Sequence, residues 1–265
     1  MSEGPRFKFG ENWQNFVVSI DESQLRNARA ALIDLLGTES LENESFLDAG
    51  CGSGINSLAA QNLGARRIHS FDYDDNSVKA TQALSSRSLA DIEWSIEQGS
   101  LTDHHYLTGL GKFDTVYTWG VIHHTGAMWQ VAESLPDLVN PGGRLIVAIY
   151  NDQGIISKIW RAIKRIYVES PSVVQTVMAA GYFAPTYLAA NLKSLILKRR
   201  LRRTRPRGMS AWHDAIDWVG GYPFEVASRE QVVEFYEQRG FTTEKVVSVG
   251  SKLGCNQFVF RSPLT

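Results

Sequence analysis

The sequence predicts an α/β fold with an open, mostly parallel sheet, and three observations carry this prediction. Short apolar runs that suit buried strands alternate with longer stretches of helical periodicity along the 265 residues. The apolar run at 46–47 breaks into a loop with glycine at positions 50, 52 and 54, where backbone can approach a ligand closely. A second strand at 67–71 leads to Asp72, 18 residues beyond Gly54, the length that a helix and a return strand consume.

The other elements can be placed from their periodicity and their end signals. Over 21–36 apolar residues recur at helical spacing, with Asp21 or Ser23 as candidate N-cap and Gly37 as the expected stop. Ser228 opens a Ser-Arg-Glu-Gln capping-box pattern at the start of another helix. Further helices are expected over 55–63, 76–85 and 127–138, and further strands over 92–96, 112–117, 144–150, 242–249 and 256–261.

Composition limits the classes of protein that the chain can be. With 265 residues and 43% apolar content, it can bury one full core plus an insertion or a small second domain. Its two cysteines, Cys51 and Cys255, lack metal-type spacing, so we expect reduced thiols in a cytoplasmic protein. No apolar stretch is long enough to span a bilayer, and the polar start does not suit a targeting segment.

Four features occur in an order that points to one family. The loop at 48–54 reads D-x-G-x-G-x-G, whereas a dinucleotide fingerprint would need glycine at position 55, where the chain has Ile55. The acid Asp72, the turn at 97–101 and the Pro-Gly-Gly turn at 141–143 follow in sequence. Together these features resemble the class I S-adenosylmethionine (SAM) dependent methyltransferases.

The resemblance implies a Rossmann-like sheet of seven strands, mostly parallel with a terminal antiparallel hairpin, and SAM as cofactor. It also implies that Asp72 accepts hydrogen bonds from the ribose diol, as an acceptor-only carboxylate can, and that the turn carrying Ser100 lines the adenine. The residues expected to bind the cofactor are Asp48, Gly50, Cys51, Gly52, Gly54, Asp72, Tyr73, Ser100, Leu101 and Trp119.

A segment at 151–227 exceeds what a strand–helix connection needs, so we expect an inserted helical cap after the fifth strand. The cofactor-binding domain then comprises 1–150 and 228–265. Helical spacing is clear over 155–168, and the apolar stretch 173–197 suits two helices or one bent helix.

Transfer of a methyl group is an in-line displacement, and a neutral acceptor must also lose a proton. His123 and His124 follow the fourth strand, and a histidine with a pKa near ~6.5 suits that proton. Because adjacent side chains diverge, at most one of the two is expected to face the acceptor. His123 is therefore the candidate general base or orienting group, although either histidine could instead bond the backbone and shape the turn.

Aromatic and polar residues around the insertion suggest where the acceptor binds. We expect an acceptor-binding wall formed by Tyr150, Asn151, Trp212, His213, Trp218 and Tyr222, or else a packed seam between cap and domain. His213 and Asp217 share a helical face, but a third metal ligand at suitable spacing is lacking, so no metal is expected.

Two further stretches leave alternatives open. The aromatic residues at 7–16 either patch the core or fold over the ligand cleft, and burial favours the patch. The stretch 193–207 holds eight basic residues and no acid, which suits a solvated loop, peripheral membrane contact through 173–207, or an RNA contact.

The function that these features favour is methyl transfer from SAM to a small molecule, with lipid-like and aromatic acceptors among the candidates. The elements that mark methyltransferases of DNA bases are lacking near 118–125, and a nucleic-acid substrate is the less favoured one. The alternatives are an RNA methyltransferase that uses the basic run at 193–207, and a SAM-binding module without catalysis.

Overall fold

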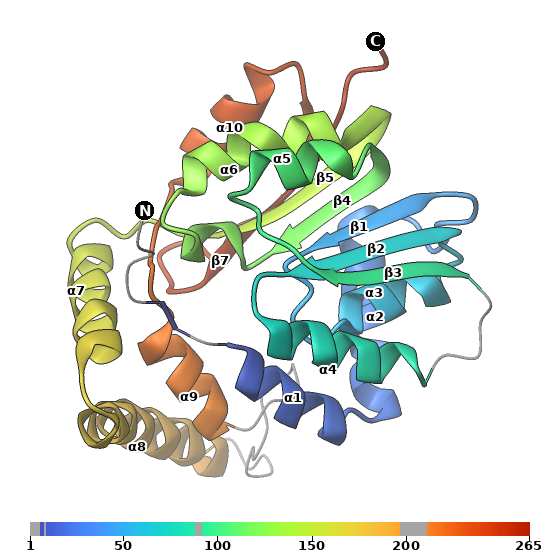
Figure 1. Ribbon diagram of the computed structural model, residues 1–265. Helices are drawn as coiled ribbons and strands as arrows, with labels where there is room; N and C mark the ends of the chain where they lie inside the picture. The colour runs from blue at the N-terminus through green and yellow to red at the C-terminus, as the bar shows by residue number, and fades with distance from the viewer. Residues whose placement is uncertain (1–5, 8, 88–91, 197–210) are drawn as a thin grey trace.

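The computed structural model describes residues 6, 7, 9–87, 92–196 and 211–265, without the side chains of 189–196, 211, 213 and 214. Seven strands form one sheet in the order β3-β2-β1-β4-β5-β7-β6 (Figure 1). β1 to β5 are parallel, and β7 runs antiparallel between β5 and β6, so the predicted fold class is confirmed. The strands are β1 Ser45–Ala49, β2 Arg67–Asp72, β3 Glu93–Gln98, β4 Phe113–Trp119, β5 Val139–Tyr150, β6 Thr242–Val247 and β7 Cys255–Arg261.

Helices cover both faces of the sheet (Figure 1). One face carries α5 His104–Gly109, α6 Met128–Ser134 and α10 Arg229–Glu237; the other carries α2 Glu22–Leu36, α3 Ile55–Asn62 and α4 Asp75–Ser85. Every residue of β1 is buried, and neighbouring residues face opposite layers. Phe46 packs in the core under α2 and α3, whereas Leu47 packs in the core under α6 and α10. The parallel strands β1, β2 and β4 therefore deliver their carboxyl ends to one edge, where ligands of open α/β sheets bind.

Capping fixes several helix ends where the sequence predicts them. Asp21 accepts from the backbone N–H of Gln24, while the Gln24 side chain accepts from the backbone N–H of Asp21. α2 ends at Gly37, whose φ of 67° lies in the left-handed region. Ser228 and Gln231 form the same reciprocal pair at the start of α10, which confirms the predicted capping box.

Three helices stand at the end of the sheet where β4 and β5 finish (Figure 1). They are α7 Ile155–Glu169, α8 Ser172–Ile196 and α9 Ala211–Gly220. α8 is a single helix containing Pro185, and the basic run from 197 to 207 lies outside the described residues. No helix in the described parts of the chain is long and apolar enough to cross a membrane.

The expected helix over 127–138 is shorter and changes type. α6 ends at Ser134, and a 3₁₀ turn, η2 Leu135–Leu138, continues from it with Pro136 in its first turn. Proline has no N–H to donate to the carbonyl four residues earlier, that of Ala132. The buried hydroxyl of Tyr236 on α10 donates to this carbonyl at 3.3 Å, so the acceptor left free by Pro136 is satisfied from another helix.

Candidate active site

The loop between β1 and α3 is held by backbone bonds to the end of β2. The N–H groups of Gly50 and Cys51 both donate to the carbonyl of Phe71, at 2.8 and 3.0 Å. Gly54 donates to the carbonyl of Cys51 at 2.8 Å and closes the turn before α3. The loop is therefore fixed to the strand that carries Asp72, without help from any side chain of its own.

The three glycines are required by close neighbours as well as by their positive φ angles. A Cβ at Gly50 would lie 2.5 Å from the side chain of Val121, which follows β4. One at Gly52 would lie 3.0 Å from the indole of Trp13, and one at Gly54 would lie 2.6 Å from Thr81. Val121 and Trp13 thus border the loop, although neither is marked by a motif.

Two carboxylates sit at this edge in different surroundings. Asp72 accepts from the N–H of Gly52 at 3.0 Å through one oxygen and from the N–H of Asp74 at 2.9 Å through the other. Burial raises its pKa to about 6 against these hydrogen bonds. Asp48 is fully buried and accepts from Ser57 Oγ at 2.5 Å, and burial raises its pKa to about 7.

The N-terminal segment crosses the carboxyl edge of the sheet and contacts both of its halves. The guanidinium of Arg6 donates to the carbonyl of Thr125 at 2.7 Å and lies 5.1 Å from the ring of Tyr73. The short helix α1 Gly10–Ser19 then lies between α4 and α9 (Figure 1). The backbone of Gly10 donates to Asp74 at 3.0 Å, and Asn12 Nδ2 donates to Asp217 Oδ1 at 2.6 Å.

These contacts decide between the two interpretations of the N-terminal aromatic residues. Phe16 and Val17 pack as a patch of core against α3 and α4. Trp13 lies on Gly52, and the ring of Phe9 lies 5.0 Å from His124. The patch that burial favours is therefore only part of the arrangement, because Phe9 and Trp13 lie over the glycine loop and the histidine turn at the carboxyl edge.

Beyond β4 the two histidines have different environments. His124 Nδ1 donates to the carbonyl of Pro223 at 2.7 Å, and burial with nearby Lys164 lowers its pKa to about 3. His123 is fully buried, with its ring 4.0 Å from that of Tyr150. Neither His123 nitrogen makes a hydrogen bond of good geometry among the described residues, and burial lowers its pKa well below the ordinary value against a weaker interaction with the backbone of Ala148. His124 therefore braces the turn, whereas His123 keeps its hydrogen-bonding capacity.

His123 and His124 belong to a larger group at the junction of the sheet and the cap, which we call the seam cluster. Its members are His123, His124, Tyr150, Lys164, Trp218 and Phe224. The Tyr150 ring is central, with the rings of Trp218 and Phe224 at 5.6 and 5.1 Å. Lys164 reaches this cluster from α7, donates to the carbonyl of Trp218, and is fully buried.

Lys164 is not among the residues predicted from the sequence, although its position on the apolar face of a helix is a signal that could have identified it. Lys164 lies one turn beyond Trp160 and next to Ile163, both on the apolar face of α7. A lysine on an apolar stripe is rarely buried without a function. Burial lowers its pKa to about 7.

Comparisons with known proteins agree with this geometry. The family model described as "Methyltransferase domain" matches residues 47–145, which run from β1 into β5. Ribosomal protein L11 methyltransferase of Methylococcus capsulatus is 28% identical over 52% of this chain and 42% of its own length. The tRNA U34 carboxymethyltransferase of Idiomarina loihiensis is 26% identical over 41% of this chain and 33% of its own length. The chain thus spans less than half the length of these curated relatives.

A solved structure agrees over a greater length. Magnesium protoporphyrin IX methyltransferase of Synechocystis PCC 6803, crystallised with bound SAH, superposes with a TM-score of 0.54 at 15% identity. The superposition covers 91% of this chain and 84% of that chain, and it bears on the fold alone. Motif, family match and strand order now coincide. Together they support a class I SAM-dependent methyltransferase, whose domain the family model matches at residues 47–145.

The SAM cofactor of this methyltransferase family fits the residues at the carboxyl edge. The glycine loop leaves no room for side chains, so a ligand would meet backbone there. A carboxylate offers about four lone-pair sites, and Asp72 uses two, so it can also accept from a ribose diol. Leu101 is buried beside the end of β3 and would supply an apolar wall for the adenine, next to Ser100.

Other expected cofactor residues take different places in the methyltransferase domain. The Cys51 thiol is buried and accepts from Thr81 Oγ1 at 3.2 Å, and burial raises its pKa. Trp119 donates through Nε1 to Gln257 on β7 at 2.9 Å and packs with the core under α2. The side chain that meets the loop from the end of β4 is that of Val121 rather than Trp119.

Among the expected acceptor residues, Tyr150 and Trp218 lie in the seam cluster, whereas Asn151, Trp212 and Tyr222 do not. The ring of Trp212 lies 5.4 Å from that of Phe183 within the cap, and Tyr222 accepts from the N–H of Phe7 through its carbonyl. The side chain of His213 lies outside the described residues.

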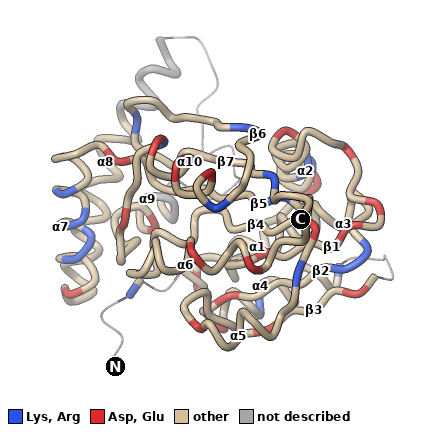
Figure 2. Tube along the Cα trace, turned by 90° about the horizontal axis from the view of Figure 1, so that it is seen from above, with Lys and Arg blue, Asp and Glu red and all other residues tan. Residues whose placement is uncertain are grey.

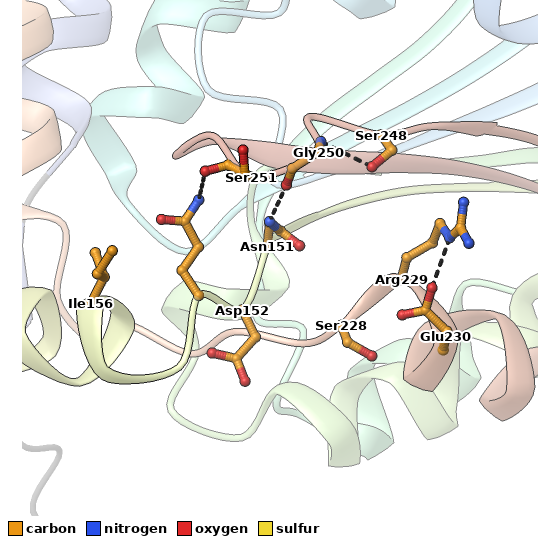
Figure 3. Close-up of a pocket in the computed structure, with 10 residues that line it drawn as sticks. Asn151, Asp152, Ile156, Ser228, Arg229, Glu230, Ser248, Gly250 and Ser251 are labelled. Carbon is orange, nitrogen blue, oxygen red and sulfur yellow. Dashed lines mark hydrogen bonds and ion pairs between the residues drawn. The ribbon is translucent and has the colours of Figure 1, made fainter.

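Asn151 borders a separate pocket (Figure 3). Its Nδ2 donates to the carbonyl of Gly250 at 2.8 Å, and its Oδ1 accepts from Asn256 at 3.0 Å. This pocket is lined by the ends of β5 and of the β6–β7 loop and by the starts of α7 and α10. None of its lining residues belongs to the glycine loop or the seam cluster, so Asn151 does not reach the expected acceptor site.

Proposed function

We propose that this protein transfers a methyl group from SAM to a small molecule bound at the seam cluster. The observation that supports this is the enclosure of the carboxyl edge. α1 bridges α4 and α9 over the glycine loop, and the cap closes the end of β5. An acceptor presented by a folded macromolecule needs an open face at the reacting atom, whereas a small molecule can be enclosed.

SAM, when bound, supplies a methyl group activated by a sulfonium. The chain then has to hold the reactants in line and exclude water. Asp72 and the glycine loop hold the cofactor end of the cleft, and α1 covers it. His123 faces Tyr150 without a hydrogen bond of good geometry at its ring nitrogens, so it is placed to orient an acceptor. Its lowered pKa makes it a weak base, and orientation is the role that we assign to it.

The identity of the acceptor does not transfer from the relatives. The two curated relatives are named for a ribosomal protein and a tRNA, and the solved neighbour is named for a porphyrin. The curated matches cover about half of this chain or less. The enclosure, rather than a relative's name, supports the small-molecule proposal over the RNA alternative.

The test uses the full chain with methyl-labelled SAM and a cell extract separated into small molecules, RNA and protein. We expect the label in the small-molecule fraction, and we expect His123→Ala to lower turnover by roughly tenfold while SAM affinity is retained. Label that becomes soluble only after ribonuclease or protease treatment would refute the small-molecule acceptor. Retained SAM binding without label in any fraction would favour the non-catalytic alternative.

We also propose that the cap contacts an anionic membrane surface. Apolar residues of α7 and α8 are strongly exposed, among them Ile155 at 74%, Val173 at 73% and Leu188 at 67%. Lysine and arginine line α7 beside them (Figure 2), and the sequence adds the basic run at 193–207. An exposed apolar face next to basic side chains is complementary to anionic lipid.

A further inference from the structure

We propose that the acceptor carries an anionic oxygen and that Lys164 is the cation that binds it. This inference rests on the proposed methyl transfer and adds the chemical class of the acceptor. It starts from a property of the seam cluster that the cofactor side does not explain. Among the described residues, the cluster buries a lysine and places no carboxylate in contact with its ammonium.

Four aromatic rings surround the ammonium of Lys164. Its Nζ lies 4.5 Å from the ring centre of Trp218, 5.0 Å from Phe224, 5.8 Å from Trp160 and 6.0 Å from Tyr150. Among the described residues no carboxylate lies within 4.0 Å of it, and its hydrogen bond goes to the neutral carbonyl of Trp218. Buried charges in proteins are normally paired, because removing an ion from water is costly.

Asp217 is the nearest acid by sequence to this site, yet it is directed elsewhere. Its Oδ1 accepts from Asn12 of α1 at 2.6 Å, so the carboxylate is engaged with the N-terminal segment. It contributes only a longer-range attraction to Lys164, too weak to offset burial, and the pKa of the lysine stays lowered to about 7. A bound oxyanion would supply the missing counter-charge.

Two further groups of the cluster make no hydrogen bond of good geometry in the described structure. They are the ring nitrogens of His123 and the indole Nε1 of Trp218, all buried. A buried polar group without a partner is costly, and two such residues around one cation indicate a polar ligand. The ammonium of Lys164 and the N–H of Trp218 are both donors, so they favour an oxygen acceptor with negative charge, whereas a protonated amine could accept from neither.

The aromatic residues of the seam cluster indicate what the remainder of the acceptor molecule should be. The rings of Phe224 and Trp218 pack against that of Tyr150, with centroids 5.1 and 5.6 Å from it, so the three rings form one continuous aromatic surface. Such walls suit a planar or apolar group. The acceptor is thus a carboxylic acid or an ionised phenol on an aromatic or apolar body.

An anionic acceptor also removes the need for a strong base. One oxygen lone pair forms the bond to the methyl carbon while the carbon–sulfur bond breaks and its electron pair stays on sulfur. The anion and the sulfonium are both neutralised, and no proton moves. The weak basicity of His123 is then no handicap.

We expect the acceptor to enter on the side where α1 contacts α9. Asn12 of α1 donates to Asp217, the residue before Trp218, so movement of α1 would loosen one contact of the turn whose carbonyl accepts from Lys164. Tyr150 and Trp218 are only half-buried and form the outer side of the cluster. An acceptor can therefore enter when α1 opens and be enclosed when it returns.

Binding of 4-nitrobenzoate and of its neutral isostere 4-nitrotoluene tests the proposal, with SAH present and tryptophan fluorescence as readout. Wild type should bind the anion at least tenfold more tightly than the neutral compound. Lys164→Met should lose that preference, whereas its SAH affinity and its binding of 4-nitrotoluene should not change. Lys158→Met, an exposed lysine on the same helix, is the matched control and should behave as wild type. Equal affinities in wild type and Lys164→Met, including no binding by either, would overturn the proposal.

A second measurement needs no variant and remains valid if Lys164→Met fails to fold. Lysine side-chain NMR on the wild-type chain should show the pKa of Lys164 rising by roughly one unit or more when 4-nitrobenzoate binds. The labelled product separates this inference from the proposed function. A methyl ester or aryl methyl ether supports both, whereas an N- or C-methylated small molecule overturns the role of Lys164 and leaves methyl transfer intact. Label in no small molecule contradicts the proposed function itself.

Discussion

Asp72 joins the glycine loop to the start of α4 through one carboxylate, and this makes its removal a sharp test of the cofactor site. Its two oxygens receive the N–H groups of Gly52 and Asp74 and would also receive the ribose diol. Hydrogen bonds to a charged group are worth about 1.5–3 kcal/mol, so Asp72→Ala should weaken SAM binding roughly ten- to hundredfold in calorimetry. Asp75→Ala, an exposed neighbour, should bind SAM as wild type does. Unchanged affinity in a folded Asp72→Ala would remove Asp72 from the site.

Asp48 should make stability depend on pH. Its pKa is about 7 in the folded chain and 3.8 as a free side chain, so the folded state holds a proton that the unfolded state releases. This contribution is complete below about pH 4 and is lost as pH rises through 7. Asp48→Asn mimics the protonated acid, and its Tm should fall less than that of wild type between pH 4 and 8. If Tm changed with pH in the same way for the two proteins, burial would not be what raises the pKa of Asp48.

Among single residues, the sequence identifies those whose place is determined by the local backbone conformation. The glycines and Asp72 stand at spacings that a βαβ unit fixes, so they can be placed from the chain alone. Val121, Trp13 and Lys164 depend on which elements meet in space, and no spacing encodes that. Trp119 and Asn151 show the converse, because each follows a strand at the right edge but turns its side chain elsewhere.

α1 lies over the glycine loop of the proposed cofactor site, and its first residue tests whether α1 retains SAM. A Cβ on Gly10 would lie 2.4 Å from the carboxylate of Asp74, which accepts from the Gly10 N–H. Overpacking costs about 1–3 kcal/mol, so Gly10→Ala should loosen α1 and speed SAM release by roughly tenfold. Hydrogen exchange over 10–19 and stopped-flow dissociation measure the two effects. Glu11→Ala, exposed on the next residue, should change neither.

Elements with strong caps and periodicity were predictable, and those shaped by distant contacts were not. α2 and α10 begin at capping boxes within the local sequence, so their starts agree with expectation. α1 has no clean period, because its faces are divided among α4, α9 and the glycine loop. The 3₁₀ turn after α6 needs both Pro136 and a hydroxyl from α10, more than 90 residues later.

The whole molecule gathers eight basic residues and no acid at 193–207, a stretch that follows the exposed apolar residues of α7 and α8 in the sequence. This arrangement predicts that the protein binds anionic vesicles and that binding weakens as salt rises. Each basic residue near such a surface contributes on the order of 1 kcal/mol, screened over roughly 8 Å at physiological salt. Neutralising Arg199, Arg200, Arg202 and Arg203 to Gln should abolish vesicle flotation and leave SAM affinity unchanged. The matched control changes four exposed basic residues away from the cap to Gln, namely Arg26, Lys79, Arg87 and Lys112. Wild-type protein that ignores vesicles but binds RNA with a steep salt dependence would refute membrane contact.

The bond between Asn12 and Asp217 joins residues 205 positions apart. During synthesis α1 leaves the ribosome before either of its neighbours exists, and it has to wait until α9 has been made. The sheet as far as β5 can form in that interval, because its five parallel strands lie within the first 150 residues. A nascent chain therefore acquires the shape of a SAM site well before it can keep SAM there. On this proposal, retention of the cofactor begins only once α9 has been made.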